Sequence, residues 1–337
     1  MKNYVEKIAE KSKVAFRSLS NSKIDQRNAA ILNISKLIKK NLASILDANK
    51  LDLKKAKEKN ISGSFLDRLT LNKKRIGDMS NGLIEIANLV DPLGRELENW
   101  KRPNGLYISK VSVPLGIIGI IYESRPNVTV DAGSLCVKSG NTSILRGGSD
   151  SFNTSQFLTK LIQEGLILAD LPKESVQSIN QTDRKMVTQM LQAVNHIDVI
   201  VPRGGKSLVS KVQKEARIPV FSHLEGICHV YVDHEADYEM AEKVLINSKL
   251  RRTGICGAAE TLLLDRNLDE KVLSKLITML LEKGCEVRSE KTIYEKFDSV
   301  ILATEEDWST EYLDSIISVK IVDGVDGAID HINKYST

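Results

Sequence analysis

The chain has 337 residues, 42% of them hydrophobic and 27% charged, so it can bury a large core and disorder is not expected. Its 48 basic and 44 acidic side chains give a net charge of +4, a balance too even for the clustered basic face typical of nucleic-acid binding. An anionic small-molecule substrate remains compatible with this charge. The length favours about two domains.

Neither a secretion signal nor a membrane span is predicted. The N-terminal segment MKNYVEKIAEK is charged and lacks the apolar core that a secretory signal needs before its cleavage site. The longest apolar stretch, residues 113–122, contains one proline and two glycines and is too short to cross a bilayer. We therefore expect a soluble, cytoplasmic protein.

The first part of the chain is predicted to be helical, followed by a β-hairpin. Over residues 4–90, apolar side chains such as Ile34 and Ile38 recur at spacings of three and four. Residues 97–113 then have the pattern of a hairpin, with Asn104-Gly105 at the tip supplying the positive φ angles of a tight turn. Such a protruding ribbon is often an oligomerisation arm.

From residue 115 onward, short apolar runs alternate with helical segments, which predicts right-handed crossovers and parallel sheets with helices on both faces. Two such series follow each other, so we expect two α/β units in tandem with a cleft between them. The predicted strands are IIGIIYE, TSILRG, IDVIVP, ICHVYVD, ETLLLD and residues 299–303 and 316–322, and the predicted helices cover residues 128–138, 151–168, 206–216, 236–250 and 269–283.

The four cysteines, at positions 136, 228, 256 and 285, form no C-x-x-C pair and have no regular spacing. This pattern encodes neither a zinc ribbon nor a disulfide framework, so reduced thiols are expected. Cys136 and Cys285 are interpreted as small buried hydrophobic residues.

The segment RRTGICGAAETLLLD, residues 251–265, places Cys256 on a glycine-flanked loop immediately before an apolar strand. In a cleft, its small neighbours would leave room for a substrate carbonyl, and Arg251 and Arg252 would favour the thiolate, which is the nucleophilic form. A cysteine before a strand is more often structural, so this segment alone leaves both interpretations open.

The segment YESRPNVT places Asn127 just after a strand and Pro126 at an expected helix start. A carboxamide there could donate a hydrogen bond to an oxyanion, although capping the helix is the alternative role for this asparagine. Two glycine-rich strand-to-helix turns, ILRGGSDS and VPRGGKS, expose backbone N–H groups and a positive helix end, which suits a dinucleotide phosphate.

The blocks YESRPNVT, ILRGG, VPRGG, SHLEGICHVYVD, RRTGICGAAETLLL and DWSTEYLDSIISVKIV, in this order, resemble the glutamate-5-semialdehyde dehydrogenase family of the aldehyde dehydrogenase superfamily. The resemblance implies an aldehyde-dehydrogenase-like α/β fold. We expect a cofactor-binding domain over residues 1–96 and 114–222, an oligomerisation hairpin over residues 97–113, and a catalytic domain over residues 223–337. The implied activity is the NADPH-dependent reduction of L-glutamyl 5-phosphate to L-glutamate 5-semialdehyde and phosphate, in proline biosynthesis, through a cysteine thioester.

The resemblance also implies the roles of individual residues. Cys256 is the nucleophile, and Asn127 with the backbone N–H of Cys256 forms the oxyanion hole. The residues expected to hold the cofactor are Arg146, Gly204, Gly205, Lys206 and, on the nicotinamide ribose, Glu311. Those expected to contact the substrate are Arg125, Arg252 and His223. Taken singly, Arg146 would be interpreted as a strand-end surface residue and Glu311 as a solvated charge at a helix end. No metal is expected.

His223 stands where hydrolytic members of the superfamily have a glutamate that activates water. Without that base the thioester is less exposed to hydrolysis, which favours phosphate, already an anionic nucleophile, as the acyl acceptor. A hydrogen-bonded structural histidine is the alternative interpretation. A homo-oligomer is expected if the C-terminus is complete, and glutamate 5-kinase is a candidate pathway partner.

The chain departs from the family in three places. Asparagine is usual at Gly257 and lysine at Ser149, which bears on the contacts to the substrate and to a 2′-phosphate. The chain also stops at HINKYST, where the family continues through a substrate-loop segment and a final strand. Two other functions stay open: a truncated, inactive chain that binds a cofactor or a partner, and a hydrolytic aldehyde dehydrogenase that uses Glu225 or Glu260 as its carboxylate.

Overall fold

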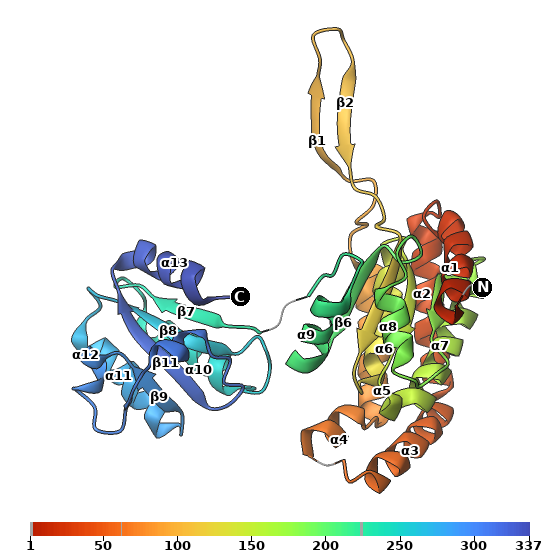
Figure 1. Cartoon of the computed structure of the whole chain (residues 1–337). Helices are drawn as coiled ribbons and strands as arrows, with labels where there is room; N and C mark the ends of the chain where they lie inside the picture. The colour runs from red at the N-terminus through yellow and green to blue at the C-terminus, as the bar shows by residue number, and fades with distance from the viewer. Residues whose placement is uncertain (1–2, 62, 223–224) are drawn as a thin grey trace. The chain divides into compact units, whose positions relative to one another are not determined.

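The computed structural model describes residues 3–61, 63–222 and 225–337, and the chain divides into two compact units, residues 1–222 and 223–337 (Figure 1). We call them the N-terminal unit and the C-terminal unit. Each contains one parallel β-sheet with helices packed against it. The predicted class, two parallel α/β units with an N-terminal helical block and a β-hairpin, is confirmed.

Five helices open the N-terminal unit, as the spacing of apolar residues predicts. The first begins at a capping box, in which the Asn3 side chain accepts from the backbone of Glu6 and the Glu6 side chain accepts from the backbone of Asn3. The apolar faces of the first three helices and of the fifth contribute to the core of this unit. The helices are α1 (Tyr4–Leu19), α2 (Ile24–Lys40), α3 (Leu42–Glu58), α4 (Gly63–Leu69) and α5 (Lys73–Asn88).

A two-stranded antiparallel hairpin follows, with β1 (Glu96–Lys101) paired to β2 (Tyr107–Val111), and it stands away from the sheet of its unit (Figure 1). Its tip differs from the predicted turn, because only Gly105 has a positive φ, +89°, and Asn104 does not. Gly105 donates to the carbonyl of Arg102, and Arg102 donates to that of Leu106. Pro103 fixes a negative φ, which favours a type I turn followed by a glycine bulge over a type I′ turn.

The sheet of the N-terminal unit has the order β5-β4-β3-β6, and all its strands are parallel. The chain steps outward from β3 in one direction through β4 and β5 and then returns to place β6 on the other side of β3. The point where the order reverses lies between the carboxyl ends of β3 and β6, which is where ligands bind in open α/β sheets. The strands are β3 (Ile117–Tyr122), β4 (Thr142–Arg146), β5 (Val176–Ser178) and β6 (Val199–Arg203), and the helices are α6 (Pro126–Lys138), α7 (Phe152–Ile167), α8 (Lys185–Leu191) and α9 (Lys206–Glu215).

Strand β3 is buried along its whole length because both of its faces are covered. Ile118 and Ile120 belong to the core cluster formed mainly with α2, α5, α6 and α7, whereas Ile117 and Ile121 belong to a second cluster formed with α1 and α8. Alternate side chains of this one strand therefore pack into two different core clusters.

The sheet of the C-terminal unit has the order β10-β9-β11-β8-β7 and is also parallel throughout. Its last strand in sequence, β11, pairs with β8 on one side and β9 on the other, so it occupies the centre of the sheet. The strands are β7 (Cys228–Val232), β8 (Ala259–Asp265), β9 (Glu286–Ser289), β10 (Ile301–Leu302) and β11 (Ile316–Val322), and the helices are α10 (Tyr238–Leu250), α11 (Glu270–Glu282), α12 (Lys291–Tyr294) and α13 (Gly324–Tyr335).

Two further findings bear on the sequence predictions. Cys136 and Cys285 are buried and all four cysteines are free thiols, which confirms both expectations. Among the helices of the described residues, none combines the length and the apolar composition required to cross a membrane.

Candidate active site

The loop between α10 and β8, residues 251–258, presents Cys256 at the edge of the C-terminal sheet where the strands begin. Cys256 is half-buried, whereas its neighbour Gly257 is exposed. A hydrogen bond from the backbone N–H of Ala258 to the carbonyl of Ile255, 3.0 Å long, bends the chain around the cysteine. We call residues 251–258 the nucleophile loop. Gly254, Gly257 and Ala258 leave little side-chain bulk around Cys256, and the half-buried cysteine has the access that nucleophilic attack on a carbonyl requires.

The segment that leads into β7 packs directly against Cys256. A Cβ atom added to Gly226 would lie 2.1 Å from the carbonyl oxygen of Cys256 and 3.1 Å from its Cβ, so only glycine fits there. The N–H of Gly226 donates to Oε1 of Glu311 over 3.0 Å. Glu311 is thus a half-buried carboxylate bound to the segment that supports Cys256. Gly226 carries no signal in the sequence, because nothing in the local pattern shows which segment it contacts.

A second thiol lies beside the nucleophile loop. Sγ of Cys228 donates to the carbonyl oxygen of Cys256 over 3.4 Å. Burial raises the pKa of Cys228, and the neighbouring Cys256, Glu260 and Glu311 raise it further. Cys228 is therefore held as a neutral thiol that donates a weak hydrogen bond, and it is a poor competitor for the role of nucleophile.

Glu260, a candidate carboxylate for a hydrolytic enzyme, lies in the core. Its side chain and that of Lys249 are both 0% exposed, and Nζ of Lys249 lies 2.6 Å from Oε2 of Glu260. Burial raises the pKa of Glu260, while the hydrogen bond and the charge of Lys249 act in the opposite direction. A buried carboxylate bound to an ammonium group is poorly suited to activate a water molecule at the loop surface.

In the N-terminal unit, the candidate cofactor residues gather where the strands end. Gly204 and Gly205 follow β6, and Lys206 begins α9. The N-terminus of α9 has no side-chain cap, so the backbone N–H groups of its first turn suit an anion. A Cβ atom added to Gly204 would lie 2.7 Å from Cδ of Glu123, which follows β3. The turn is therefore closely packed against the β3 end, at the reversal point of the sheet.

Asn127 lies in the first turn of α6, but it does not cap the helix. The residue before the helix is Arg125, whose side chain makes no capping hydrogen bond, and Pro126 takes the first helical position. The alternative interpretation of Asn127 as the N-cap is therefore wrong. Its Nδ2 donates to Oδ2 of Asp131 over 3.1 Å, and burial raises the pKa of Asp131. This contact orients the amide and engages one of its two hydrogens.

Arg146 is buried, with 7% of its surface exposed, so its interpretation as a strand-end surface residue is wrong. One guanidinium nitrogen donates to the carbonyl of Gly147 and the other to that of Thr182, over 2.9 Å in the second case. Its Nε has no hydrogen-bond partner among the described residues. Arg146 therefore ties the end of β4 to the loop after β5, and its expected role at the cofactor phosphates stays a prediction.

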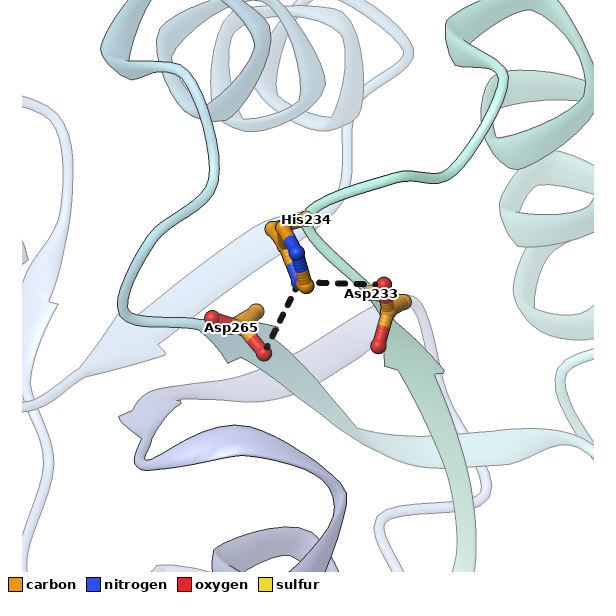
Figure 2. A group of neighbouring side chains, drawn as sticks. All are labelled: Asp233, His234 and Asp265. Carbon is orange, nitrogen blue, oxygen red and sulfur yellow. Dashed lines mark ion pairs between the residues drawn. The ribbon is translucent and has the colours of Figure 1, made fainter.

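Figure 2 shows a separate cluster of ionisable groups at the opposite edge of the C-terminal sheet, after β7 and β8. Nδ1 of His234 lies 3.1 Å from Oδ1 of Asp233 and 3.8 Å from Oδ2 of the buried Asp265. Tyr231 donates to both carboxylates, and Asp265 also accepts from the backbone of Asn267. These groups are accounted for by contacts with one another.

The residues expected to contact the substrate differ in exposure. Arg252 is exposed on the nucleophile loop, and Arg125 is half-buried after β3. His223 lies outside the described residues.

Comparison with known proteins identifies relatives of this chain. The profile of the aldehyde dehydrogenase family matches residues 1–284. A γ-glutamyl phosphate reductase of Allorhizobium ampelinum is 53% identical over 331 residues, which make up 98% of this chain and 78% of that protein.

Two crystal structures of γ-glutamyl phosphate reductases are also similar. The enzyme from Thermotoga maritima has a TM-score of 0.92 at 42% identity and is matched over 99% of this chain and 81% of its own. The one from Saccharomyces cerevisiae has a TM-score of 0.63 at 31% identity, over 100% and 85% of the two chains. The predicted resemblance is confirmed: the chain belongs to the aldehyde dehydrogenase family and, within it, to the γ-glutamyl phosphate reductases, also called glutamate-5-semialdehyde dehydrogenases.

Proposed function

We propose that this chain reduces L-glutamyl 5-phosphate to L-glutamate 5-semialdehyde and phosphate, a step of proline biosynthesis, with NADPH as the cofactor. The observation that carries the proposal is the half-buried Cys256, with the small residues Gly254, Gly257 and Ala258 around it, in a chain 53% identical to a γ-glutamyl phosphate reductase. The kinase that forms L-glutamyl 5-phosphate is the corresponding pathway partner.

Cys256 acts as the nucleophile in this proposal. Its thiolate attacks the carbonyl carbon of the acyl phosphate, and the bond from that carbon to the phosphate oxygen breaks. Inorganic phosphate departs, and the acyl group remains on the sulfur as a thioester. The second hydrogen on the Asn127 amide and the backbone N–H of Cys256 donate to the carbonyl oxygen as negative charge develops there. Arg125 and Arg252 are proposed to bind the α-carboxylate of the substrate.

The residues at the reversal point of the N-terminal sheet suit a nicotinamide dinucleotide. The uncapped start of α9 and the turn at Gly204, where a side chain would collide with Glu123, provide backbone N–H groups for the diphosphate, and Lys206 adds a positive charge. Glu311 is proposed to bind the nicotinamide ribose and Arg146 to support the phosphate site. The bound cofactor supplies the hydride that reduces the thioester.

Phosphate, and not water, is proposed as the acyl acceptor in the reverse direction. Of the two carboxylates considered for a hydrolytic enzyme, Glu260 is buried and paired with Lys249. Glu225 is half-buried, and its carbonyl oxygen accepts from the side chain of Thr337. With His223 in place of the usual glutamate, a thioester on Cys256 is proposed to be less exposed to hydrolysis.

The β1–β2 hairpin is proposed to be an oligomerisation arm that joins copies of the chain. Such an arm needs apolar surface to bury, and the hairpin and its flanks expose several large apolar side chains. The exposed fractions are 58% for Leu97, 41% for Trp100, 57% for Leu106, 60% for Tyr107 and 70% for Val113.

The test is the oxidation of glutamate 5-semialdehyde by NADP⁺, with and without phosphate, in the wild-type chain and in Cys256→Ala. We expect turnover that requires phosphate in the wild type and none in Cys256→Ala. Cys285→Ala, which removes a buried thiol outside the site, is the control and should retain turnover. Turnover by Cys256→Ala would reject the nucleophile, and turnover of the wild type without phosphate would favour a hydrolytic enzyme.

A further inference from the structure

The two residues that flank the nucleophile loop form an ion pair inside the C-terminal unit. Lys249 is near the end of α10 and Glu260 is near the start of β8, so their contact closes the loop at its base. Both side chains are fully buried, and the distance from Nζ to Oε2 is 2.6 Å. Such a pair contributes little net stability, because the cost of removing two charges from water offsets their attraction. A role in fixing local geometry is the better explanation for it.

The same pair also reaches the segment that carries Glu311. The second carboxylate oxygen of Glu260 accepts from the backbone N–H of Leu313 over 3.4 Å. Leu313 has a φ of +54°, a conformation that non-glycine residues adopt rarely and that the surroundings must hold. Its carbonyl oxygen would lie 3.8 Å from a Cβ atom added to Gly254, which places this segment near the nucleophile loop.

Lys249 also lies near this segment. Its ammonium group is 6.0 Å from the ring centroid of Tyr312, and the guanidinium of Arg288 is 5.2 Å from the same centroid. The hydroxyl of Tyr312 is 2.7 Å from Oδ1 of Asp307 and 2.7 Å from the hydroxyl of Ser318 on β11. The segment from Glu311 to Leu313 is therefore fixed to the sheet by Tyr312 and to the ion pair by Leu313.

We propose that Lys249 and Glu260 are a positioning pair, which holds the nucleophile loop and the Glu311 segment in the relative geometry that the reaction of Cys256 requires. The inference rests on the proposed function for its link to catalysis. Neither residue touches the substrate. Each acts through the backbone of its neighbours, so loss of the pair should lower turnover more than cofactor binding.

The decisive variant is Lys249→Met/Glu260→Leu, which replaces both charges by apolar side chains of similar size. Removing both partners leaves no buried charge unpaired, so the melting temperature of this variant should be close to that of the wild type. Each single replacement should have a lower melting temperature, because it leaves one buried charge without its partner. Its kcat should nevertheless fall about tenfold or more, with the KM for NADP⁺ changed less than about twofold. A merely structural role predicts that kcat recovers together with the melting temperature.

Hydrogen exchange measured by mass spectrometry provides a readout that does not depend on turnover. In the double variant, exchange should accelerate in residues 251–258 and 310–315 and stay unchanged in the centres of β8 and β11. The matched control is Lys296→Met/Glu270→Leu, which removes an exposed ion pair of the same unit, 2.7 Å long, and should change neither kcat nor the exchange of those two segments.

Each outcome decides the proposal. A double variant with wild-type kcat, or with unchanged exchange in both segments, overturns it. If the double variant does not fold, Glu260→Asp takes its place, because it keeps the charge and shortens the reach: lowered kcat with faster local exchange supports the pair, and wild-type values overturn it. A wild-type chain without phosphate-dependent turnover refutes the proposed function, while the exchange measurement still tests the positioning.

Discussion

The two parallel sheets use opposite edges for their candidate site residues. In the N-terminal unit, Asn127 and the Gly204 turn follow the strands, at the carboxyl edge. In the C-terminal unit, Cys256, Gly226 and Glu311 all precede the strands, at the amino edge. Helix N-termini lie at the carboxyl edge and suit anionic phosphates, whereas the amino edge offers loops whose shape depends on what packs beneath them.

The general rule that ligands bind at the carboxyl ends of parallel strands fits the candidate residues of the N-terminal sheet but not those of the C-terminal sheet. The carboxyl edge of the C-terminal sheet also holds ionisable groups, Asp233, His234 and Asp265, which resemble a site at first sight (Figure 2). Their contacts are made with one another and with Tyr231. Cys256, the proposed nucleophile, lies at the opposite edge, where backbone packing and not a charged cluster defines the candidate site.

The largest expected effect follows from the close contact of Gly226 with Cys256. In Gly226→Ala, the new methyl carbon must avoid a carbonyl oxygen that it would meet at 2.1 Å, and the nucleophile loop must move. Because displacements of about 1 Å at a reacting group cost about a hundredfold in rate, we expect kcat/KM to fall by at least that factor. Steady-state kinetics in the direction of semialdehyde oxidation measure it.

The control for Gly226→Ala lies at the other edge of the same sheet. Asp233→Asn removes one charge from the cluster of Figure 2 and should change kcat/KM by less than about twofold, because surface ion pairs contribute little. A large loss of activity in Asp233→Asn, or full activity in Gly226→Ala, would reverse the assignment of the two edges.

A smaller effect is expected on the stability of the C-terminal unit at acidic pH. His331 of α13 is 5% exposed, packs against Trp308 and Tyr335, and has no hydrogen-bond partner for either ring nitrogen among the described residues. Burial, with the positive charge of Lys320, lowers the pKa of His331 from 6.5 to about 4. Between these two pH values His331 is protonated in the unfolded chain but neutral in the folded unit. The free energy of unfolding therefore falls as the pH falls from 6.5 towards 4.

By linkage, the free energy of unfolding of the C-terminal unit should fall by about 2 kcal/mol between pH 7 and pH 5 because of this group alone. Denaturant unfolding of the chain at the two pH values measures the loss. His331→Phe keeps an aromatic ring beside Trp308 and should reduce the pH dependence by that amount. An unchanged pH dependence in His331→Phe would show that the imidazole is hydrated or protonated in the folded chain.

The smallest effect concerns the carboxyl edge of the N-terminal sheet. Gly204→Ala brings a methyl group within 2.7 Å of Glu123 and 2.8 Å of Leu208, so the turn should move away from the bound phosphates. We expect the KM for NADP⁺ to rise about tenfold with little change in kcat, because glycine at such a turn permits close approach of the backbone.

Gly77→Ala in α5 is the matched control for this substitution. No atom outside its own helix lies within 4 Å of the added Cβ, so it should leave the KM unchanged and add about 0.5–1 kcal/mol of stability. An equal rise in KM in both variants would show that the effect is not local to the turn.

The sequence predicted the elements well where the pattern is local. Strand β11 spans residues 316–322 as predicted, and α10 and α11 begin within two residues of the expected positions. The hairpin was also predicted, but its turn type was wrong because the constraint imposed by Pro103 outweighs the preference of Asn104-Gly105. Similarly, Pro126 moved the cap of α6 back to Arg125 and left Asn127 inside the first turn.

The support of the site could not be predicted from local patterns. That Gly226 touches Cys256 depends on the parallel register of β7 against β8, in which Cys228 faces Ala259. The pairing of Lys249 with Glu260 depends on how α10 packs on the same strand. Such contacts are set by register and packing over tens of residues, and no spacing rule encodes them.

The central place of β11 determines when the reactive site can form as the polypeptide leaves the ribosome. Cys256 and its neighbours emerge first, but β8 lacks its partner on one side until β11 inserts between it and β9. Glu311 and Leu313 directly precede that strand and are delivered by its insertion. Within the described residues, the central strand of this sheet and the segment that carries Glu311 and Leu313 are therefore made together, several seconds of translation after the cysteine.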